Sequence, residues 1–311
     1  MPFPRQTPRG QPVHGWLVLD KPSGMSSSQA VGAVRRLLDA AKAGHGGTLD
    51  PLATGVLPIA LGEATKTVTW VMKGWKTYRF TLRWGEARDT DDAEGRVTGS
   101  SPARPSPAAI AAALPGFTGR LQQRPPAFSA LKLAGERAYR LAREGEAVEL
   151  APRPVDVAEL RLIGVLDPDH AEFEAVVGKG TYIRALGRDL ATALGTLAHI
   201  TRLRRLAVGR FRAERAISLD NLAGLGHSAA ASGHLLPVET ALDDIPALAL
   251  SEEEAHRLRC GQAVTPLRPL DRARIEQLGE GATVRATTGD RLVAVAEIAA
   301  GGIRPVRVLN L

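Results

Sequence analysis

The feature that most constrains this chain is a glycine-rich loop, residues 44–55, that contains a single carboxylate. The loop reads Gly-His-Gly-Gly-Thr-Leu-Asp-Pro-Leu-Ala-Thr-Gly. Its glycines let the backbone adopt positive φ or approach a ligand closely. Pro51 fixes its own φ and pushes Asp50 toward an extended conformation. The pattern predicts an acid held at a defined angle, as a nucleophilic or basic carboxylate requires. A plain Asp-Pro surface turn is the alternative.

Length and charge favour a globular protein with a polyanionic partner. The 311 residues are enough for two domains, each with its own core. The formal net charge is +7. Residues 247–311 hold nine Arg and no Lys against eight acidic residues, so +6 of that charge belongs to residues 1–246. An excess of this kind is typical of proteins that bind nucleic acid.

Other features argue against secreted, membrane and metal-binding classes. No apolar run approaches the roughly 20 residues that span a bilayer, and residues 1–13 lack the apolar centre of a signal peptide. The only cysteine, Cys260, cannot form an internal disulfide or a thiolate cluster, and we expect it in the core. The acidic run 89–94 is expected to be a solvated turn, because Ser100 stands where an EF-hand needs glutamate. We therefore expect a cytoplasmic protein with no metal site and no membrane partner.

Hydrophobic periodicity predicts an α+β protein. Short apolar runs fit buried strands, and the alternation over residues 77–84 fits a half-buried strand. The other strands are expected at 16–19, 56–61 and 173–177, and the helices at 26–41, from 107 onward, at 135–144 and at 183–194. A small, polar stretch around 223–233 indicates a domain boundary. Beyond it we expect a helix at 251–259 and strands at 283–287, 292–298 and 306–309, which together suggest a small β-barrel.

Seven further blocks accompany the Asp50 loop in a fixed order. They are residues 15–27, 57–66, 76–80, 89–95, 124–132, 180–184 and 203–205. With the loop, they resemble the bacterial TruB family of pseudouridine synthases, the tRNA pseudouridine-55 synthases, over roughly residues 14–222. The resemblance implies the pseudouridine synthase fold, a mixed and mainly antiparallel sheet flanked by helices.

The resemblance also implies a domain plan. Residues 1–13 would be a tail and residues 14–230 the catalytic domain. An insertion at about 124–153 would act as a thumb that closes on tRNA, with Arg137, Arg140 and Arg143 on a basic helix. Residues 247–311 resemble a PUA-like RNA-binding β-barrel, whose near-neutral charge suggests an accessory grip.

By the same resemblance, the chain would isomerise uridine to pseudouridine at position 55 in the T-loop of tRNA, with no cofactor and no obligate protein partner. Asp50 would be the essential carboxylate, acting on a base that has flipped out of its stack. Arg184 would hold Asp50 ionised and oriented, and Tyr78 would stack on the flipped uracil. Attack on the base, attack on the ribose and removal of a ribose proton all stay open for Asp50.

The resemblance also implies that further residues bind the substrate. His45 would fill the space left by flipped nucleotides, and Lys21 would buttress the site. Leu203 would line the pocket beneath the base, with Tyr182 exposed nearby. The cradle for RNA phosphates would include Arg202, Arg204 and Arg205. Two other functions stay open, a tRNA-folding chaperone of the same fold and a carbohydrate-active hydrolase that pairs Asp50 with a second acid.

Overall fold

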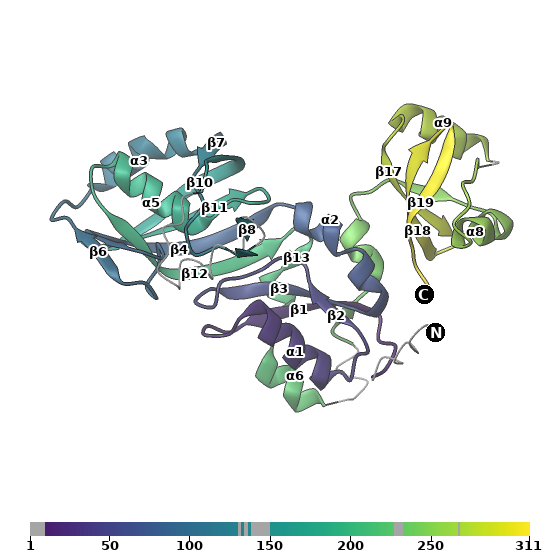
Figure 1. Cartoon of the computed structure of the whole chain (residues 1–311), viewed down its shortest axis with the longest axis horizontal. Helices are drawn as coiled ribbons and strands as arrows, with labels where there is room; N and C mark the ends of the chain where they lie inside the picture. Colours follow the sequence, from purple (N-terminus) through teal and green to yellow (C-terminus); the bar gives the residue numbers. More distant parts are fainter. Residues whose placement is uncertain (1–9, 130–131, 134–135, 138–149, 227–232, 267) are drawn as a thin grey trace.

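The computed structural model describes residues 10–129, 132–133, 136–137, 150–226, 233–266 and 268–311. An eleven-stranded sheet organises the larger part of the chain (Figure 1). Its main path runs β14–β1–β3–β12–β4–β11–β10–β7, and β2, β13 and β15 pair at its margins. Among the described strands, β14 pairs with β1 and β12 with β3 in parallel, whereas the other pairs of this sheet are antiparallel. The predicted mixed, mainly antiparallel sheet is confirmed.

The strands of this sheet have the following bounds: β1 Gly15–Lys21, β2 Ala43–His45, β3 Thr54–Leu61, β4 Lys76–Trp84, β7 Gly119–Gln123, β10 Arg153–Asp167, β11 His170–Val177, β12 Ala198–Val208, β13 Phe211–Arg212, β14 Ile217–Ser218 and β15 Leu235–Leu236. In the described part of the chain, two short hairpins lie outside it, β5 Glu86–Arg88 with β6 Val97–Ser100, and β8 Lys132–Leu133 with β9 Glu136–Arg137.

The central strands β1 and β3 are buried on both faces, which explains why their sequences are continuously apolar. Leu17 and Leu19 of β1 belong to one hydrophobic cluster, whereas Trp16 and Val18 belong to another on the opposite face. A strand covered on both sides needs no polar alternation. In β4, by contrast, Arg79 is exposed between partly buried Tyr78 and buried Phe80, in keeping with the alternation in its sequence.

Helices cover the sheet where its apolar residues need burial. In Figure 1, α1 (Ser27–Leu37) and α6 (Leu219–Leu225) pack against the half that contains β1, and α3 (Pro107–Ala113) and α5 (Ile183–Ala193) lie against the other half. Ser26 caps α1 in a capping box with Gln29. The predicted helices at 26–41, from 107 onward and at 183–194 are confirmed, with ends that differ by a few residues. Further helical turns among the described residues of this part are α2 Val68–Lys73, η1 Gly62–Lys66, η2 Leu114–Phe117, η3 Ala213–Arg215 and η4 Val238–Leu242.

The C-terminal part forms a separate four-stranded sheet in the order β16–β17–β18–β19. Its elements are β16 Ala247–Ala249, α8 Glu252–Arg259, α9 Pro269–Leu278, β17 Thr283–Thr288, β18 Arg291–Ala299 and β19 Gly302–Val308. The predicted helix and three strands are confirmed, but the predicted closed barrel is wrong for the described residues. The sheet stays open, and α8 closes over the core that it shares with β17 and β18. Cys260 follows α8 and is exposed, so its predicted core position is also wrong.

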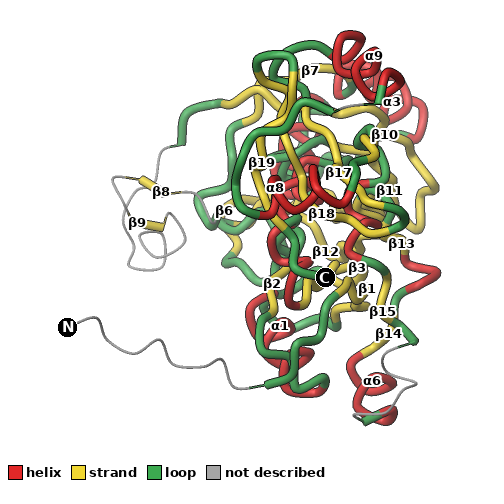
Figure 2. The backbone as a smooth tube through the Cα atoms, turned by 90° about the vertical axis from the view of Figure 1, so that its right-hand side faces the viewer, coloured by secondary structure: helices red, strands yellow, loops and turns green. Residues whose placement is uncertain are grey.

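The C-terminal sheet is joined to the larger part of the chain by a buried contact. Leu292, Val295 and Leu309 share a hydrophobic cluster with Trp16 and Val18. Beside this cluster, Lys66 donates to the carbonyl of Val308 at 2.8 Å and the amide of Asn310 donates to Glu63 at 2.7 Å. Figure 2, seen from the side of the C-terminal part, shows β18 and β19 in front of the large sheet. The shared cluster fixes the position of the C-terminal sheet.

The structure differs from the predicted domain plan at the end of the large sheet and within the insertion. β15 lies beyond residue 230 and pairs with β1, so the large sheet continues past the predicted end of the catalytic domain. Within the insertion, Glu136–Arg137 is a strand and not part of the predicted helix at 135–144. Arg140 and Arg143 lie outside the described residues. Among the described residues, no helix combines the length and the apolar character that crossing a bilayer requires.

Candidate active site

Buried hydrogen bonds fix the backbone on both sides of Asp50. On one side, the hydroxyl of Ser27 at the start of α1 accepts from the amide of Leu49 at 2.8 Å and donates to its carbonyl at 3.0 Å. On the other side, the carbonyl of Pro51 accepts from the amide of Gly24 at 2.9 Å and from Lys21 at 3.2 Å. The carboxylate therefore projects from a segment whose neighbours cannot shift independently.

A second anchor lies beneath the glycine-rich part of the loop. The guanidinium of Arg205 donates to the carbonyls of Val56 at 2.7 Å, Gly47 at 3.0 Å and Thr48 at 3.1 Å. Its approach requires glycine at two positions. Gly47 has φ +141°, and a Cβ at Gly55, where φ is +97°, would collide with the backbone of Arg205. The glycines thus let a β12 arginine reach the loop carbonyls.

Arg205 is only 1% exposed. Its predicted role in contacting RNA phosphates is therefore wrong, because its N–H groups are turned toward the loop carbonyls. The basic cluster in the sequence could not distinguish a buried anchor from a surface cation, since both are arginines in one strand.

Asp50 forms an ion pair with the buried arginine that the sequence singled out. Nε of Arg184, in the first turn of α5, donates to Oδ2 of Asp50 at 2.9 Å. The Arg184 side chain is 4% exposed and that of Asp50 is 34% exposed. Burial alone would lower the pKa of Arg184. The negative charges of Asp50 and Asp92 have the larger effect, so the pKa of Arg184 is raised. The pair therefore keeps a permanent positive charge against a carboxylate that still reaches the surface.

The other N–H groups of Arg184 are held by two further segments. Nη1 donates to the carbonyl of Thr90 at 2.7 Å and Nη2 to that of Phe128 at 2.9 Å. Nε also lies 3.5 Å from a carboxylate oxygen of Asp92. Arg184 is thus fixed in one orientation, and it joins the Asp50 loop to the acidic turn and to the start of the insertion.

The acidic turn is part of this site, contrary to the expected solvated turn. Asp92 is 3% exposed and accepts from the hydroxyl of Thr90 at 2.6 Å. Its neighbour Asp91 has φ +60° and pairs with Arg188 at 2.9 Å, one helical turn after Arg184. Burial raises the pKa of Asp91 to about 6, although Arg188 opposes the shift. The sequence alone did not show this burial, because it comes from the bridge between Asp92 and Ile200 of β12, which is distant in the chain.

Tyr78 and Leu203 lie on the side of the sheet that faces the loop. Across β4 and β12, Tyr78 pairs with Arg205 and Phe80 with Leu203. The guanidinium carbon of Arg205 is 6.0 Å from the centre of the Tyr78 ring, within the range of a cation–π contact. Tyr78 is partly buried and Leu203 is 6% exposed.

Tyr182 immediately precedes α5 and places its aromatic ring in the electrostatic field of Asp50. Its backbone is fixed by Gln123, which accepts from the amide at 2.8 Å and donates to the carbonyl at 3.1 Å. Burial raises the pKa of Tyr182, and the charge of Asp50 adds to the shift. The phenol is therefore neutral near pH 7. The structure brings Asp50 and Arg184 into contact, and Tyr182 lies two residues before Arg184.

Lys21 and His45 are two basic side chains beside the loop, and burial lowers the pKa of each. Lys21 is fully buried and donates to the carbonyls of Pro22 and Met25, both at 2.7 Å. Burial lowers the pKa of Lys21 to about 8, against the attraction of Asp50. Burial and the charge of Arg205 lower the pKa of His45, so its imidazole is neutral at pH 7. Lys21 acts on the loop backbone, which fits the predicted buttress.

Arg202 and Arg204 lie on the opposite face of the sheet from Tyr78. Arg204 pairs with Arg79 across the strands, and side chains alternate between faces along each strand. Its guanidinium forms two bonds with Asp20, at 2.8 and 3.0 Å. Arg202 is exposed on β12. The two residues therefore do not belong to the pocket at Asp50, and a contact between Arg202 and RNA stays a prediction for another face.

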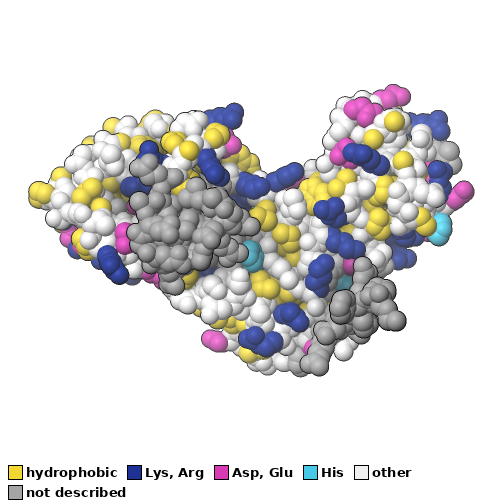
Figure 3. Space-filling view, viewed as in Figure 1, with side chains coloured by type: hydrophobic (Ala, Val, Ile, Leu, Met, Phe, Trp, Pro, Cys, Tyr) yellow, Lys and Arg dark blue, Asp and Glu magenta, His cyan; other side chains and the backbone are white. Residues whose placement is uncertain are grey.

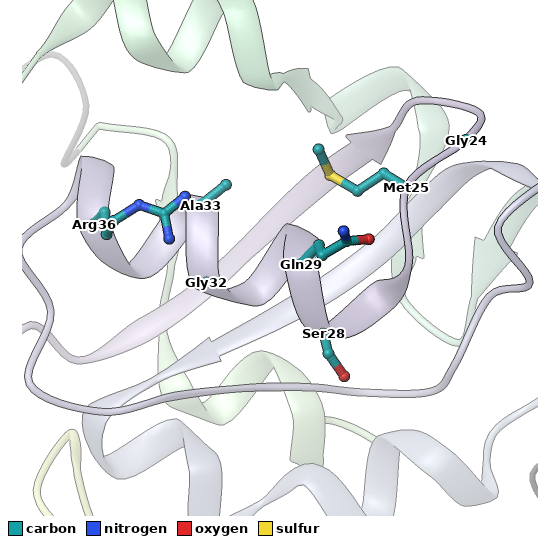
Figure 4. A pocket seen from close by; sticks show the side chains of 7 residues that line it. All are labelled: Gly24, Met25, Ser28, Gln29, Gly32, Ala33 and Arg36. Carbon is teal, nitrogen blue, oxygen red and sulfur yellow. The ribbon is translucent and has the colours of Figure 1, made fainter.

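A shallow hollow lies along the outer side of α1 (Figure 4). Its lining residues are Gly24, Met25, Ser28, Gln29, Gly32, Ala33 and Arg36. It contains none of the predicted site residues, although the Met25 carbonyl binds Lys21 on the inner side. The candidate active site is therefore the surface around Asp50 and not this hollow.

The fold has known counterparts. One is a crystal structure of a Cbf5–Nop10–Gar1 complex, with a TM-score of 0.71 and 26% identity over 96% of this chain and 84% of that chain. Another is the structure of an H/ACA RNP bound to a substrate RNA containing 2′-deoxyuridine, with a TM-score of 0.73 and 22% identity over 98% of this chain and 91% of that chain. These likenesses show that the fold is shared with these solved complexes, and this chain adds to it an aspartate paired with a buried arginine.

The particular family follows from the sequence. The model of the TruB family pseudouridylate synthase N-terminal domain matches residues 35–183, and that of the tRNA pseudouridylate synthase B C-terminal domain matches residues 184–243. The chain is 54% identical to a tRNA pseudouridine synthase B of Rhodospirillum rubrum, over 97% of this chain and 98% of the relative. It is 57% identical to one of Bradyrhizobium diazoefficiens, over 96% of this chain and 86% of the relative. The chain belongs to the TruB family.

Proposed function

We propose that this chain converts uridine to pseudouridine at position 55 in the T-loop of tRNA, and that Asp50 is the essential carboxylate. Membership of the TruB family makes it a tRNA pseudouridine synthase, an isomerase. The choice of position 55, the role of Asp50 and a cytoplasmic location are the finer parts of the proposal.

The observation that carries the proposal is the contrast in exposure between Asp50 and Arg184. An arginine at 4% exposure is shielded from water, so its charge acts strongly on the nearby carboxylate. Asp50 keeps a third of its side chain exposed, which leaves an oxygen free to meet a substrate.

The isomerisation fits an ionised carboxylate and needs no cofactor. The bond between N1 of uracil and C1′ of ribose breaks, the ring turns, and a bond between C5 and C1′ forms. N1 gains a proton and C5 loses one, so the atoms balance without an added reactant. Attack on the base, attack on the ribose and removal of a ribose proton each use the carboxylate of Asp50, which Arg184 orients through a 2.9 Å hydrogen bond.

The base must leave its stack to reach Asp50, which costs a few kcal/mol. Tyr78 offers an aromatic face that offsets this cost, since stacking on a side chain contributes about 1–3 kcal/mol per base. Leu203, on the same side of β12, provides an apolar floor beneath the ring. His45 is neutral, so it fits the space-filling role and does not compete with Arg184 for Asp50.

The test is incubation of the chain with a tRNA transcript and with an isolated T-arm hairpin, followed by nucleoside analysis and mapping of the modified position. We expect pseudouridine at position 55 in both RNAs, with no change in mass and no free uracil. Pseudouridine at another position would contradict the site assignment. Release of free uracil or a reducing sugar would favour the hydrolase.

A further inference from the structure

The turn between α2 and β4 presents an exposed tryptophan. Trp75 is 50% exposed, whereas Trp16 and Trp84 are almost completely buried. Met72, in the last turn of α2 and three residues before Trp75, is 37% exposed. A large aromatic face at the surface costs solvation free energy unless something covers it. The mechanism at Asp50 makes no use of Trp75.

The backbone that carries Trp75 is held rigidly. The ammonium of Lys76, which is 8% exposed, donates to the carbonyls of Met72 and Gly74, both at 2.6 Å. The amide of Gly209 donates to the carbonyl of Trp75 at 2.9 Å. A ring presented on a fixed turn loses little conformational entropy when a partner binds it.

Three exposed cations surround this turn. Lys73 ends α2, Lys179 follows the end of β11, and Arg210 follows Gly209. The end of β11 lies beside the start of β4, because Val177 pairs with Lys76. Burial, with the charges of Arg205 and Lys179, lowers the pKa of Lys76 to about 8, in keeping with Lys179 lying close. Arg210 contacts Asp244 at 3.0 Å, but Asp244 is 82% exposed, so water screens that pair.

We call Trp75, Lys73, Lys179 and Arg210 the Trp75 rim. Figure 3 shows Lys and Arg side chains over the surface around α2 and along the hollow between the catalytic part and the C-terminal part. The rim lies near the active site along the chain, because Trp75 precedes Tyr78 by three residues at the start of β4, and Lys179 lies in the turn between β11 and Tyr182. Three residues of extended strand span about 10 Å. An RNA whose uridine reaches Asp50 therefore has other nucleotides within reach of the rim.

We propose that the Trp75 rim is a second RNA contact, where an unstacked base of the bound tRNA other than the target uridine stacks on Trp75 and neighbouring phosphates meet the cations. An aromatic face between cations suits a single-stranded nucleotide, whose base has a π-face and whose backbone is anionic. The proposal rests on the proposed function only in taking tRNA as the partner.

The first experiment measures tRNA affinity and tryptophan fluorescence in the full chain. Trp75→Ala weakens binding of a tRNA transcript by about 5- to 150-fold, the range expected for one stacked base. Trp75→Phe, which keeps an aromatic face, restores most of the affinity. Leu166→Ala is the control, because Leu166 is 57% exposed near the end of β10, at the opposite end of β4 from Trp75, and it leaves affinity unchanged. Thermal melting checks that each variant is folded.

Fluorescence provides an independent readout. Saturating tRNA quenches the emission of the parent chain by stacking on Trp75, and Trp75→Phe removes most of that quenching. Lys179→Gln lowers the slope of log affinity against log salt by about one, as loss of one phosphate contact predicts.

The following outcomes decide the proposal. Unchanged affinity in Trp75→Ala with unchanged quenching in Trp75→Phe overturns it, as does a change in oligomeric state with unchanged tRNA binding. The proposed function fails separately, by the absence of pseudouridine at position 55 in tRNA treated with the parent chain. Weaker tRNA binding by Trp75→Ala would still support the rim in that case.

Discussion

Replacement of Arg205 by methionine distinguishes a buried anchor from an RNA-binding cation. The structure shows three hydrogen bonds from this guanidinium to the carbonyls of Gly47, Thr48 and Val56. Methionine has a similar reach but no donor, so all three carbonyls lose their charged partner. The loop that carries Asp50 would then lose its support from below.

The magnitude follows from the number of bonds and their burial. A hydrogen bond to a charged group contributes about 1.5–3 kcal/mol, so three such bonds set an upper limit of about 9 kcal/mol. Methionine keeps apolar contacts and the loop relaxes toward water, which reduces the loss. We expect the free energy of unfolding to fall by about 3–5 kcal/mol, a typical cost of breaking a buried polar network. The Tm would fall by about 6–20 °C for a domain of this size.

The assay combines thermal unfolding with tRNA binding at several salt concentrations. Arg202→Met is the matched control, because Arg202 is an exposed arginine on the same strand. We expect Arg205→Met to lower Tm strongly and Arg202→Met to leave it within about 1 °C. The reasoning is refuted if Arg205→Met keeps the parent Tm and instead lowers the salt slope of binding by about one.

Three further substitutions test the rest of the site. Arg184→Met removes the donor to Asp50 and should lower the single-turnover rate constant by about 100- to 1,000-fold, while tRNA affinity stays within about threefold; equal losses in both would contradict a role at the reacting group. Ser27→Ala removes both bonds to Leu49 and should cost about 1–3 kcal/mol of stability, with a fall in kcat larger than any rise in KM; an unchanged kcat would argue against the loop anchor. Burial raises the pKa of Asp91 to about 6, so between pH 4 and pH 6 the folded chain keeps a proton that the unfolded chain has released. The free energy of unfolding should therefore fall by on the order of 2–3 kcal/mol as the pH rises from about 4 to 6. Asp91→Asn should remove this slope in urea unfolding series, and an identical slope in both proteins would contradict the assignment.

The sequence predicted elements well where local patterns decide them. The alternation in β4 reflects one exposed and one buried face, and the Ser26–Gln29 capping box marks the start of α1. The closed barrel was wrong because strand patterns do not specify whether a sheet closes. α9 was missed, since it begins at Pro269 and exposes Leu270, so its apolar residues do not form a clear stripe.

The sequence indicated which residues belong to the site, but not which of them contact one another. Asp50 and Arg184 are 134 positions apart, and only the fold shows that they touch. The cluster Arg202, Arg204 and Arg205 looked uniform in sequence, but strand alternation sends Arg204 to one face and Arg205 to the other. Asp92 resembled part of a solvated turn, because burial depends on the contact of that turn with β12.

The central claim is that the Asp50 carboxylate takes part in the reaction, and Asp50→Asn tests it most directly. The amide has the same shape but no charge, so the loop and its anchors should stay in place. We predict no pseudouridine above background in a single-turnover assay, with tRNA affinity within about threefold of the parent chain. Formation of pseudouridine at a rate near that of the parent would contradict the account.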